Sequence, residues 1–173
     1  MPAIFVTPLS QVEPTIKRHK PSHLMTLLSP GHMIETPEGI EAGRHLRLGL
    51  NDVSAAELSE DPPNEQHVEQ LIRFGRSWNA KAPMLVHCWA GVSRSTAAAY
   101  IVLCDRFGPF REKEIAKALR LRAPHASPNP LMIALADRVL GRNGRMNVAI
   151  ESIGHGTIVA EGEVVELPLS DEL

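Results

Sequence analysis

The segment from residue 83 to residue 107 limits the fold more than any other part of the sequence. Pro83 to Val86 is a short apolar run that predicts a buried strand, and residues 94–107 are small and apolar throughout, which predicts a buried helix. A strand that leads through a short loop into a buried helix is typical of layered α/β folds. We therefore expect a sheet covered by helices.

The rest of the chain predicts further strands before this segment and further helices after it. Apolar or alternating runs predict strands at residues 4–9, 23–28 and 45–50. Helical spacing predicts helices at about residues 64–79, 115–121 and 128–140, whereas Pro14 leaves residues 11–20 as a weak helix at best. This order predicts the α/β class, with a central, mostly parallel, four- to five-stranded sheet flanked by helices.

Composition excludes several classes of protein. The 173 residues fit one domain, and 43% hydrophobic and 22% charged residues are globular proportions. With 18 Lys and Arg against 20 Asp and Glu, the net charge of -2 provides no field for nucleic acid or an anionic membrane. Two cysteines rule out a disulfide scaffold. We expect a cytoplasmic protein that binds neither nucleic acid nor membrane, and its oligomeric state stays open.

Residues 87–95 read His-Cys-Trp-Ala-Gly-Val-Ser-Arg-Ser and combine the features of an oxyanion site. The residues between Cys88 and Arg94 can curl so that backbone N–H groups point inward, and Gly91 permits backbone angles that other residues resist. The helix that begins near Arg94 directs its positive end to the same point, where the guanidinium can bind two oxygens. Because this field favours the Cys88 thiolate, the sequence predicts a nucleophile aimed at phosphorus.

The motif His-Cys-x5-Arg-Ser resembles that of the cysteine-dependent protein tyrosine phosphatase superfamily, and residues 87–95 match it in full. The chain looks most like the small dual-specificity phosphatases, with a resemblance from about His45 to Leu140 that includes Ser127-Pro128-Asn129-Pro130. The resemblance implies a phosphotyrosine phosphatase-like fold. It also implies hydrolysis of phosphotyrosine, with phosphoserine and phosphothreonine as further candidate substrates.

The same resemblance implies a role for each residue of the motif. Cys88 would attack the phosphoester and carry the phosphoryl group, while Ser95 would donate a hydrogen bond to its sulfur. His87 would support the loop from beneath, and Asn129 would either only begin a helix or also brace the loop. The implied phosphate-binding residues are Trp89, Ala90, Gly91, Val92, Ser93 and Arg94.

A general acid must protonate the leaving oxygen, and aspartate is the residue type that the resemblance implies. Asp52 directly follows the strand at residues 45–50, and Leu50-Asn51-Asp52 resembles the acid position of small dual-specificity enzymes. Asp61 lies in the same loop and is the alternative. We expect Asp52 to act as the acid and then to activate water for the second step.

The expected partner is a phosphorylated protein or a small phosphoester, with no cofactor and no metal. The phosphate loop carries no lysine, so a phosphoinositide substrate is less expected. Two alternatives remain. The chain could be a non-catalytic module of the same fold that binds phosphate or phosphopeptides. Alternatively, the anion-binding loop at residues 88–94 could bind another oxyanion, such as arsenate.

The C-terminal residues differ in character from the rest. We divide the chain into a single phosphatase-like catalytic domain at residues 1–144 and a C-terminal extension at residues 145–173. In the extension, two apolar runs flank Glu161-Gly162-Glu163 and predict either a hairpin added to the domain or a partner-binding segment.

Overall fold

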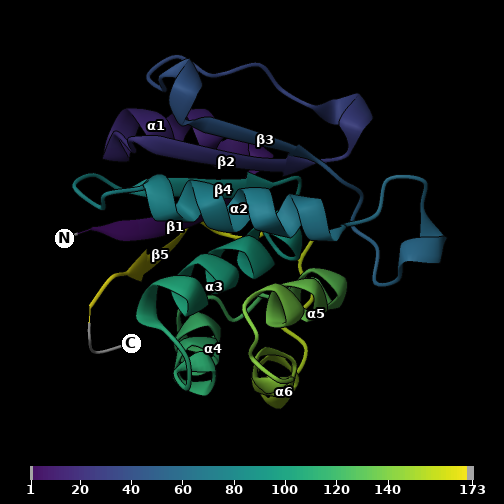
Figure 1. Ribbon diagram of the computed structural model, residues 1–173. Helices are drawn as coiled ribbons and strands as arrows, with labels where there is room; N and C mark the ends of the chain where they lie inside the picture. Colours follow the sequence, from purple (N-terminus) through teal and green to yellow (C-terminus); the bar gives the residue numbers. More distant parts are fainter. Residues whose placement is uncertain (1, 171–173) are drawn as a thin grey trace.

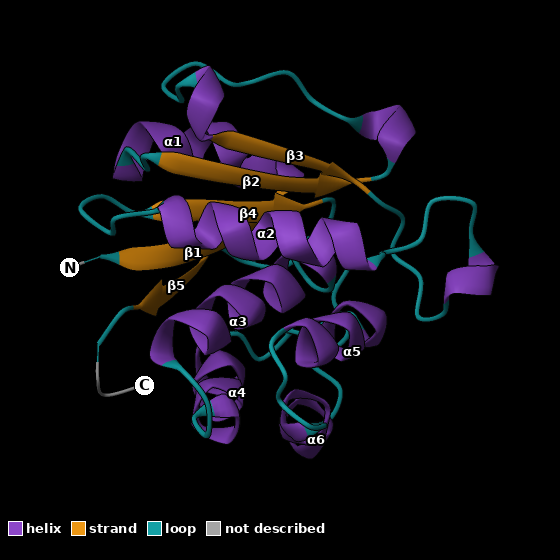
Figure 2. Cartoon of the chain, viewed as in Figure 1, coloured by secondary structure: helices purple, strands orange, loops and turns teal. Residues whose placement is uncertain are grey.

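A five-stranded sheet forms the centre of the computed structural model, which describes residues 2–170 (Figure 1). The strand order is β3-β2-β4-β1-β5, as the side-by-side strands in Figure 2 show. Pairing is parallel throughout β3, β2, β4 and β1, and β5 joins the edge of β1 in the antiparallel direction. The strands are β1 Ala3–Pro8, β2 His23–Leu28, β3 His45–Gly49, β4 Met84–Cys88 and β5 Val165–Pro168. The predicted mostly parallel sheet is confirmed.

Among the described residues, six α-helices cover the two faces of this sheet unequally. One face packs against α1 through a small apolar cluster that includes Phe5, Ile16 and Leu85. The other face carries α2 and α3, with α4, α5 and α6 outside them (Figure 1). The helices are α1 Val12–His19, α2 Glu65–Ser77, α3 Arg94–Phe107, α4 Glu112–Arg122, α5 Pro130–Val139 and α6 Arg145–Ser152. In the described part of the chain, no helix is both long and apolar enough to cross a bilayer.

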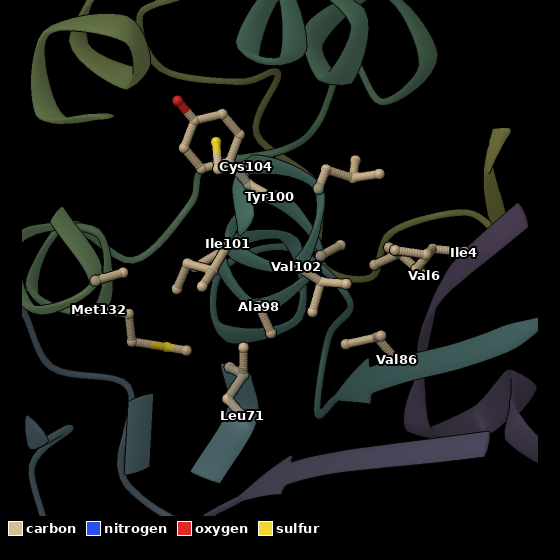
Figure 3. Packing of buried hydrophobic residues seen from close by; sticks show 14 of the residues in the cluster. Ile4, Val6, Leu71, Val86, Ala98, Tyr100, Ile101, Val102, Cys104 and Met132 are labelled. Atoms are coloured by element: carbon tan, nitrogen blue, oxygen red, sulfur yellow. The ribbon is translucent and has the colours of Figure 1, made fainter. Parts of the chain in front are cut away.

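Helix α3 lies at the centre of the main core, as its apolar sequence predicts. Its residues Arg94 to Cys104 are all buried. Figure 3 shows Ala98 directed toward Leu71 of α2 and Val102 toward Val86 of β4. Cys104 is fully buried near the C-terminal end of α3, and burial raises the pKa of its thiol to about 12. The packing of α3 on all sides holds its N-terminus, where Arg94 lies, in a fixed position against the sheet.

The N-terminal segment forms a regular α-helix, α1, although it contains Pro14. Pro14 is the third residue of α1, which begins at Val12. The first four N–H groups of a helix have no intrahelical acceptor, so the missing N–H of Pro14 removes no hydrogen bond. Pro14 was expected from the sequence to weaken a helix at residues 11–20, but a proline in the first turn does not interrupt the helix.

The C-terminal residues pack on the same core as the rest of the chain. Met146 and Ala149 of α6 and Val165 and Leu167 of β5 are buried in the main cluster. A helix at residues 145–152 was not expected from the sequence. The expected hairpin does not form within the described residues, because residues 157–160 adopt no strand and β5 pairs with β1 instead. Residues 171–173 lie outside the described chain.

Candidate active site

The phosphate loop lies where β4 ends and α3 begins. Cys88 is the last residue of β4 and Arg94 is the first of α3. Since β1, β2, β3 and β4 are parallel, their carboxyl ends meet at this edge, and Pro8 of β1 is in register with Cys88. The carboxyl edge of an open parallel sheet is the usual ligand-binding position in α/β folds.

Hydrogen bonds from the surrounding segments orient the backbone of the loop. Four of its carbonyl groups accept backbone N–H groups from elsewhere in the chain. The donor and acceptor residues are Leu9 to Trp89, Gly162 to Ala90, Ser127 to Val92 and Asn129 to Ser93, with N···O distances of 3.1, 2.7, 3.0 and 3.2 Å. In a trans peptide the next N–H points away from the carbonyl. The N–H groups that follow these carbonyls therefore point into the loop, as an anion cradle requires.

Gly91 is the residue that lets the loop lie against β1. Its φ is +70°, and a Cβ at this position would lie 2.6 Å from the backbone nitrogen of Pro8 and 2.7 Å from the carbonyl carbon of Thr7. Both atoms belong to the backbone of a buried strand and cannot move aside. The sequence prediction that residue 91 needs glycine therefore has two causes, a positive φ and a close approach of two backbones.

The thiol and the guanidinium meet in this cradle. Cys88 is a free, buried cysteine, and its Sγ lies 3.1 Å from Ser95 Oγ. Arg94 is 7% exposed, and its Nη1 donates to the carbonyl oxygen of Leu50 at 2.9 Å. Among the described residues, Nε of Arg94 is buried without a hydrogen-bond partner. A buried guanidinium N–H without an acceptor is costly, and a bound oxyanion would satisfy it.

His87 lies beneath the loop in a chain of hydrogen bonds. Its Nδ1 is 3.1 Å from the carbonyl oxygen of Cys88 and its Nε2 is 2.7 Å from Thr26 Oγ1. Thr26 Oγ1 is also 2.8 Å from Nε2 of His45, whose Nδ1 is 2.9 Å from Thr36 Oγ1. Burial lowers the pKa of both histidines to about 4, so both rings are neutral near pH 7.

The neutral rings fix the direction of every hydrogen bond in this chain. A carbonyl only accepts, so Nδ1 of His87 carries the proton and its Nε2 accepts from the Thr26 hydroxyl. Thr26 has then used its proton, so it accepts from Nε2–H of His45. The Thr36 hydroxyl donates to the remaining nitrogen of His45. The contacts thus agree with a supporting role for His87, and they add Thr26 and His45, which sequence analysis missed because the strands that carry them are far apart in sequence.

Asp52 is held beside the loop by two side chains. Its Oδ1 accepts from Ser93 Oγ at 2.7 Å and from Asn129 Nδ2 at 2.8 Å. Asn129 also caps α5, since its Oδ1 accepts from the N–H of Met132 at 2.9 Å. Asn129 therefore begins α5, as one of the two sequence-based interpretations has it, and only its backbone N–H contacts the phosphate loop, at Ser93. Its side chain adds a contact with Asp52 that was not foreseen.

A cavity of about 340 Å³ brings most of the predicted site residues together. Asp61 is not among the residues that line it, and its backbone closes the preceding loop by accepting from Asn51 N–H at 2.7 Å. Val159, from the C-terminal extension, lines the cavity and was missed, because no motif surrounds it. Trp89 forms part of the rim and is 55% exposed. The lining residues are Asp52, Cys88, Trp89, Ala90, Val92, Ser93, Arg94 and Val159.

The chain is similar to the dual-specificity phosphatases, in its fold and over about half of its sequence. No family model matches the sequence. Dual specificity protein phosphatase 15 of the rat is 30% identical over 89 residues, which are 50% of this chain and 34% of the relative, and the mouse protein matches equally. The match thus spans about a third of the length of these relatives.

Solved structures show the same fold at lower identity. The crystal structure of DUSP15 superposes with a TM-score of 0.62 at 18% identity, over 88% of this chain and 91% of that one. The human tyrosine phosphatase-like serine/threonine/tyrosine-interacting protein has a TM-score of 0.63 at 18% identity, over 80% of this chain and 91% of that one. PTPMT1 in complex with PI(5)P has a TM-score of 0.60 at 16% identity, over 88% and 93% of the two chains.

Proposed function

We propose that this protein is a cysteine-dependent protein phosphatase that hydrolyses phosphotyrosine, with phosphoserine and phosphothreonine as further substrates, through a cysteinyl-phosphate intermediate. One observation carries the proposal. The Cys88 thiol lines the same cavity as Arg94, whose buried Nε has no hydrogen-bond partner among residues 2–170, and Asp52 lines it too. A nucleophile, an oxyanion receptor and an acid in one cavity suit phosphoryl transfer.

In the first step, the Cys88 thiolate attacks phosphorus. A sulfur–phosphorus bond forms as the ester phosphorus–oxygen bond breaks, and the leaving oxygen takes a proton from Asp52. The inward N–H groups of the loop and the Arg94 guanidinium bind the phosphoryl oxygens throughout. Most of the rate enhancement comes from this positioning and charge stabilisation.

In the second step, water hydrolyses the intermediate. Asp52, now a carboxylate, accepts a proton from the water as it attacks phosphorus, and the sulfur–phosphorus bond breaks. The Ser95 hydroxyl, 3.1 Å from the sulfur, donates to the departing Cys88 thiolate. His87 takes no part in proton transfer, because it is neutral and both of its nitrogens are engaged.

A non-catalytic module is the second candidate, because the chain shares its fold with a phosphatase-like interacting protein. The deciding experiment incubates the protein with a phosphotyrosyl peptide in buffer that contains EDTA and measures phosphate release. We expect release by the wild type and none by Cys88→Ser. Wild-type turnover in that variant would overturn the mechanism, and peptide binding without release by the wild type would favour the module.

The remaining assignments follow from the chemistry. We propose the cytoplasm as the compartment, because a reducing environment keeps the Cys88 thiol available. We also propose that residues 1–144 supply the catalytic chemistry. The extension at residues 145–173 then completes the fold around it, through α6 and β5.

A further inference from the structure

The segment between α6 and β5 crosses the phosphate loop. In Figure 1 the yellow chain leaves α6, passes α5 and returns to the sheet as β5. At its start, N–H groups of Gly156 and Thr157 donate to Ser127 Oγ at 3.0 Å and to the carbonyl oxygen of Pro124 at 2.9 Å. Near its end, the N–H of Gly162 donates to the carbonyl of Ala90 in the loop. We call residues 154–164 the crossing segment.

Two glycines allow the crossing segment to lie directly on its neighbours. A Cβ at Gly162 would lie 2.6 Å from Nε2 of His125 and 3.0 Å from the carbonyl oxygen of Gly91. A Cβ at Gly156 would lie 2.5 Å from the carbonyl oxygen of Ala126. A larger residue at either position would push the crossing segment away from these neighbours. The contacts at Gly156 and Gly162 are the two anchors of the crossing segment. They hold the residues between them close to the active site.

Val159 lies between these anchors and lines the same cavity as Cys88. It is 39% exposed, although it is apolar. Among the described residues that line the cavity, the others belong to the phosphate loop or its ends, or are Asp52. Val159 is thus an apolar surface of the site that lies outside the phosphate-binding machinery.

We propose that Val159, held by the crossing segment, is a specificity-determining residue that packs with Trp89 against the aromatic ring of a phosphotyrosyl substrate. The proposal rests on the proposed function and deepens it. Trp89 is 55% exposed at the same cavity, and an aromatic ring buries apolar area against both side chains. The short CH₂ stem of phosphoserine offers far less area. Arg94 is the one basic residue among those described that line the cavity, so a second phosphate has no further cation there.

Binding to catalytically inactive protein tests this role without depending on turnover. Titration calorimetry of Cys88→Ser measures the Kd of a phosphotyrosyl peptide and of inorganic phosphate, alone and combined with Val159→Ala. We expect the second substitution to weaken peptide binding about fivefold, because two methyl groups of partly buried surface are lost. The Kd of phosphate should change less than twofold, since phosphate has no ring.

Ile158→Ala in the same background is the matched control, because Ile158 is the adjacent residue, is 98% exposed and does not line the cavity. It should change neither Kd, and Val159→Ile should restore peptide binding. Equal weakening of peptide and phosphate by Val159→Ala would indicate a merely structural role and overturn the proposal, as would no change in either. If Cys88→Ser binds neither ligand, this inference and the proposed function both fail. If it binds both but the wild type releases no phosphate, only the proposed function fails.

Discussion

Asn129 and Asp52 are joined by a hydrogen bond of 2.8 Å from Nδ2 of the amide to Oδ1 of the carboxyl. The bond links the start of α5 to the loop after β3, across 77 positions of sequence. Asn129 also donates from Nδ2 to the carbonyl oxygen of Val53 at 3.0 Å. The amide thus fixes the loop that carries the proposed acid, and Asn129 is a positioning residue for Asp52.

Replacing Asn129 should separate this positioning role from the helix cap. Asn129→Ser keeps an N-cap oxygen but loses the amide hydrogen bonds to Asp52 and Val53, so we expect the free energy of unfolding to fall by about 1–3 kcal/mol. We expect kcat for a phosphotyrosyl peptide to fall about tenfold, because Asp52 loses a fixed orientation. Steady-state kinetics and urea denaturation measure the two effects. An unchanged kcat, whatever the change in stability, would show that Asn129 does not position Asp52.

Asp52→Asn should reveal the acid through the leaving group. General acid catalysis contributes about 10² to 10⁴ in rate, so we expect kcat/KM for a phosphotyrosyl peptide, which reports the first step, to fall at least a hundredfold. The loss should be much smaller for 4-nitrophenyl phosphate, since nitrophenolate leaves without a proton. Asp61→Asn is the control and should behave as wild type. If Asp61→Asn instead shows the leaving-group effect, Asp61 is the acid.

Ser95→Ala should slow the second step more than the first. Its hydroxyl is 3.1 Å from the sulfur that departs in that step. Hydrogen bonds to charged groups contribute about 1.5–3 kcal/mol, which corresponds to a loss of about 10- to 100-fold in the breakdown of the intermediate. Rapid-quench kinetics should show a burst of aryl product in the variant. Equal slowing of the burst and the steady state would contradict this role.

Gly91→Ala should abolish activity through the backbone. The new Cβ would lie 2.6 Å from the Pro8 nitrogen, so the phosphate loop must shift from β1. Gly141→Ala is a matched control, because Gly141 also has a positive φ, +64°, but a Cβ there would meet none of the described residues within 4 Å. We expect the control to lose about 1 kcal/mol of stability through its positive φ and to keep full activity. Inactivity of both variants would assign the effect to φ alone.

Stability should fall as pH falls from 6.5 toward 4, in part because of His45. Burial lowers the pKa of folded His45 from 6.5 to about 4, so below pH 6.5 the unfolded state binds the proton more readily. The stabilisation is complete above pH 6.5 and is lost as pH approaches 4. Denaturation of wild type and His45→Gln at several pH values measures the difference, which should shrink over this range. Parallel curves for the two proteins would contradict the assignment.

The sequence alone predicts the sheet and the phosphate loop because their signals are local. The apolar runs at β1, β2 and β4 lie within single segments, and the spacing of Cys88 and Arg94 is contained in one loop. In the same way, the position of Asp52 directly after β3 makes it a candidate acid. Local patterns of this kind depend on side-chain periodicity and on short-range backbone geometry.

Only the tertiary structure decides which distant segments complete the site. The contact of Asn129 with Asp52, the hydrogen bonds of Thr26 to His87 and His45, and the presence of Val159 in the cavity all join residues far apart in sequence. Such contacts depend on how α5, the parallel strands and the crossing segment pack on α3 and the sheet. No single segment encodes them, because the close packing of several elements sets their positions.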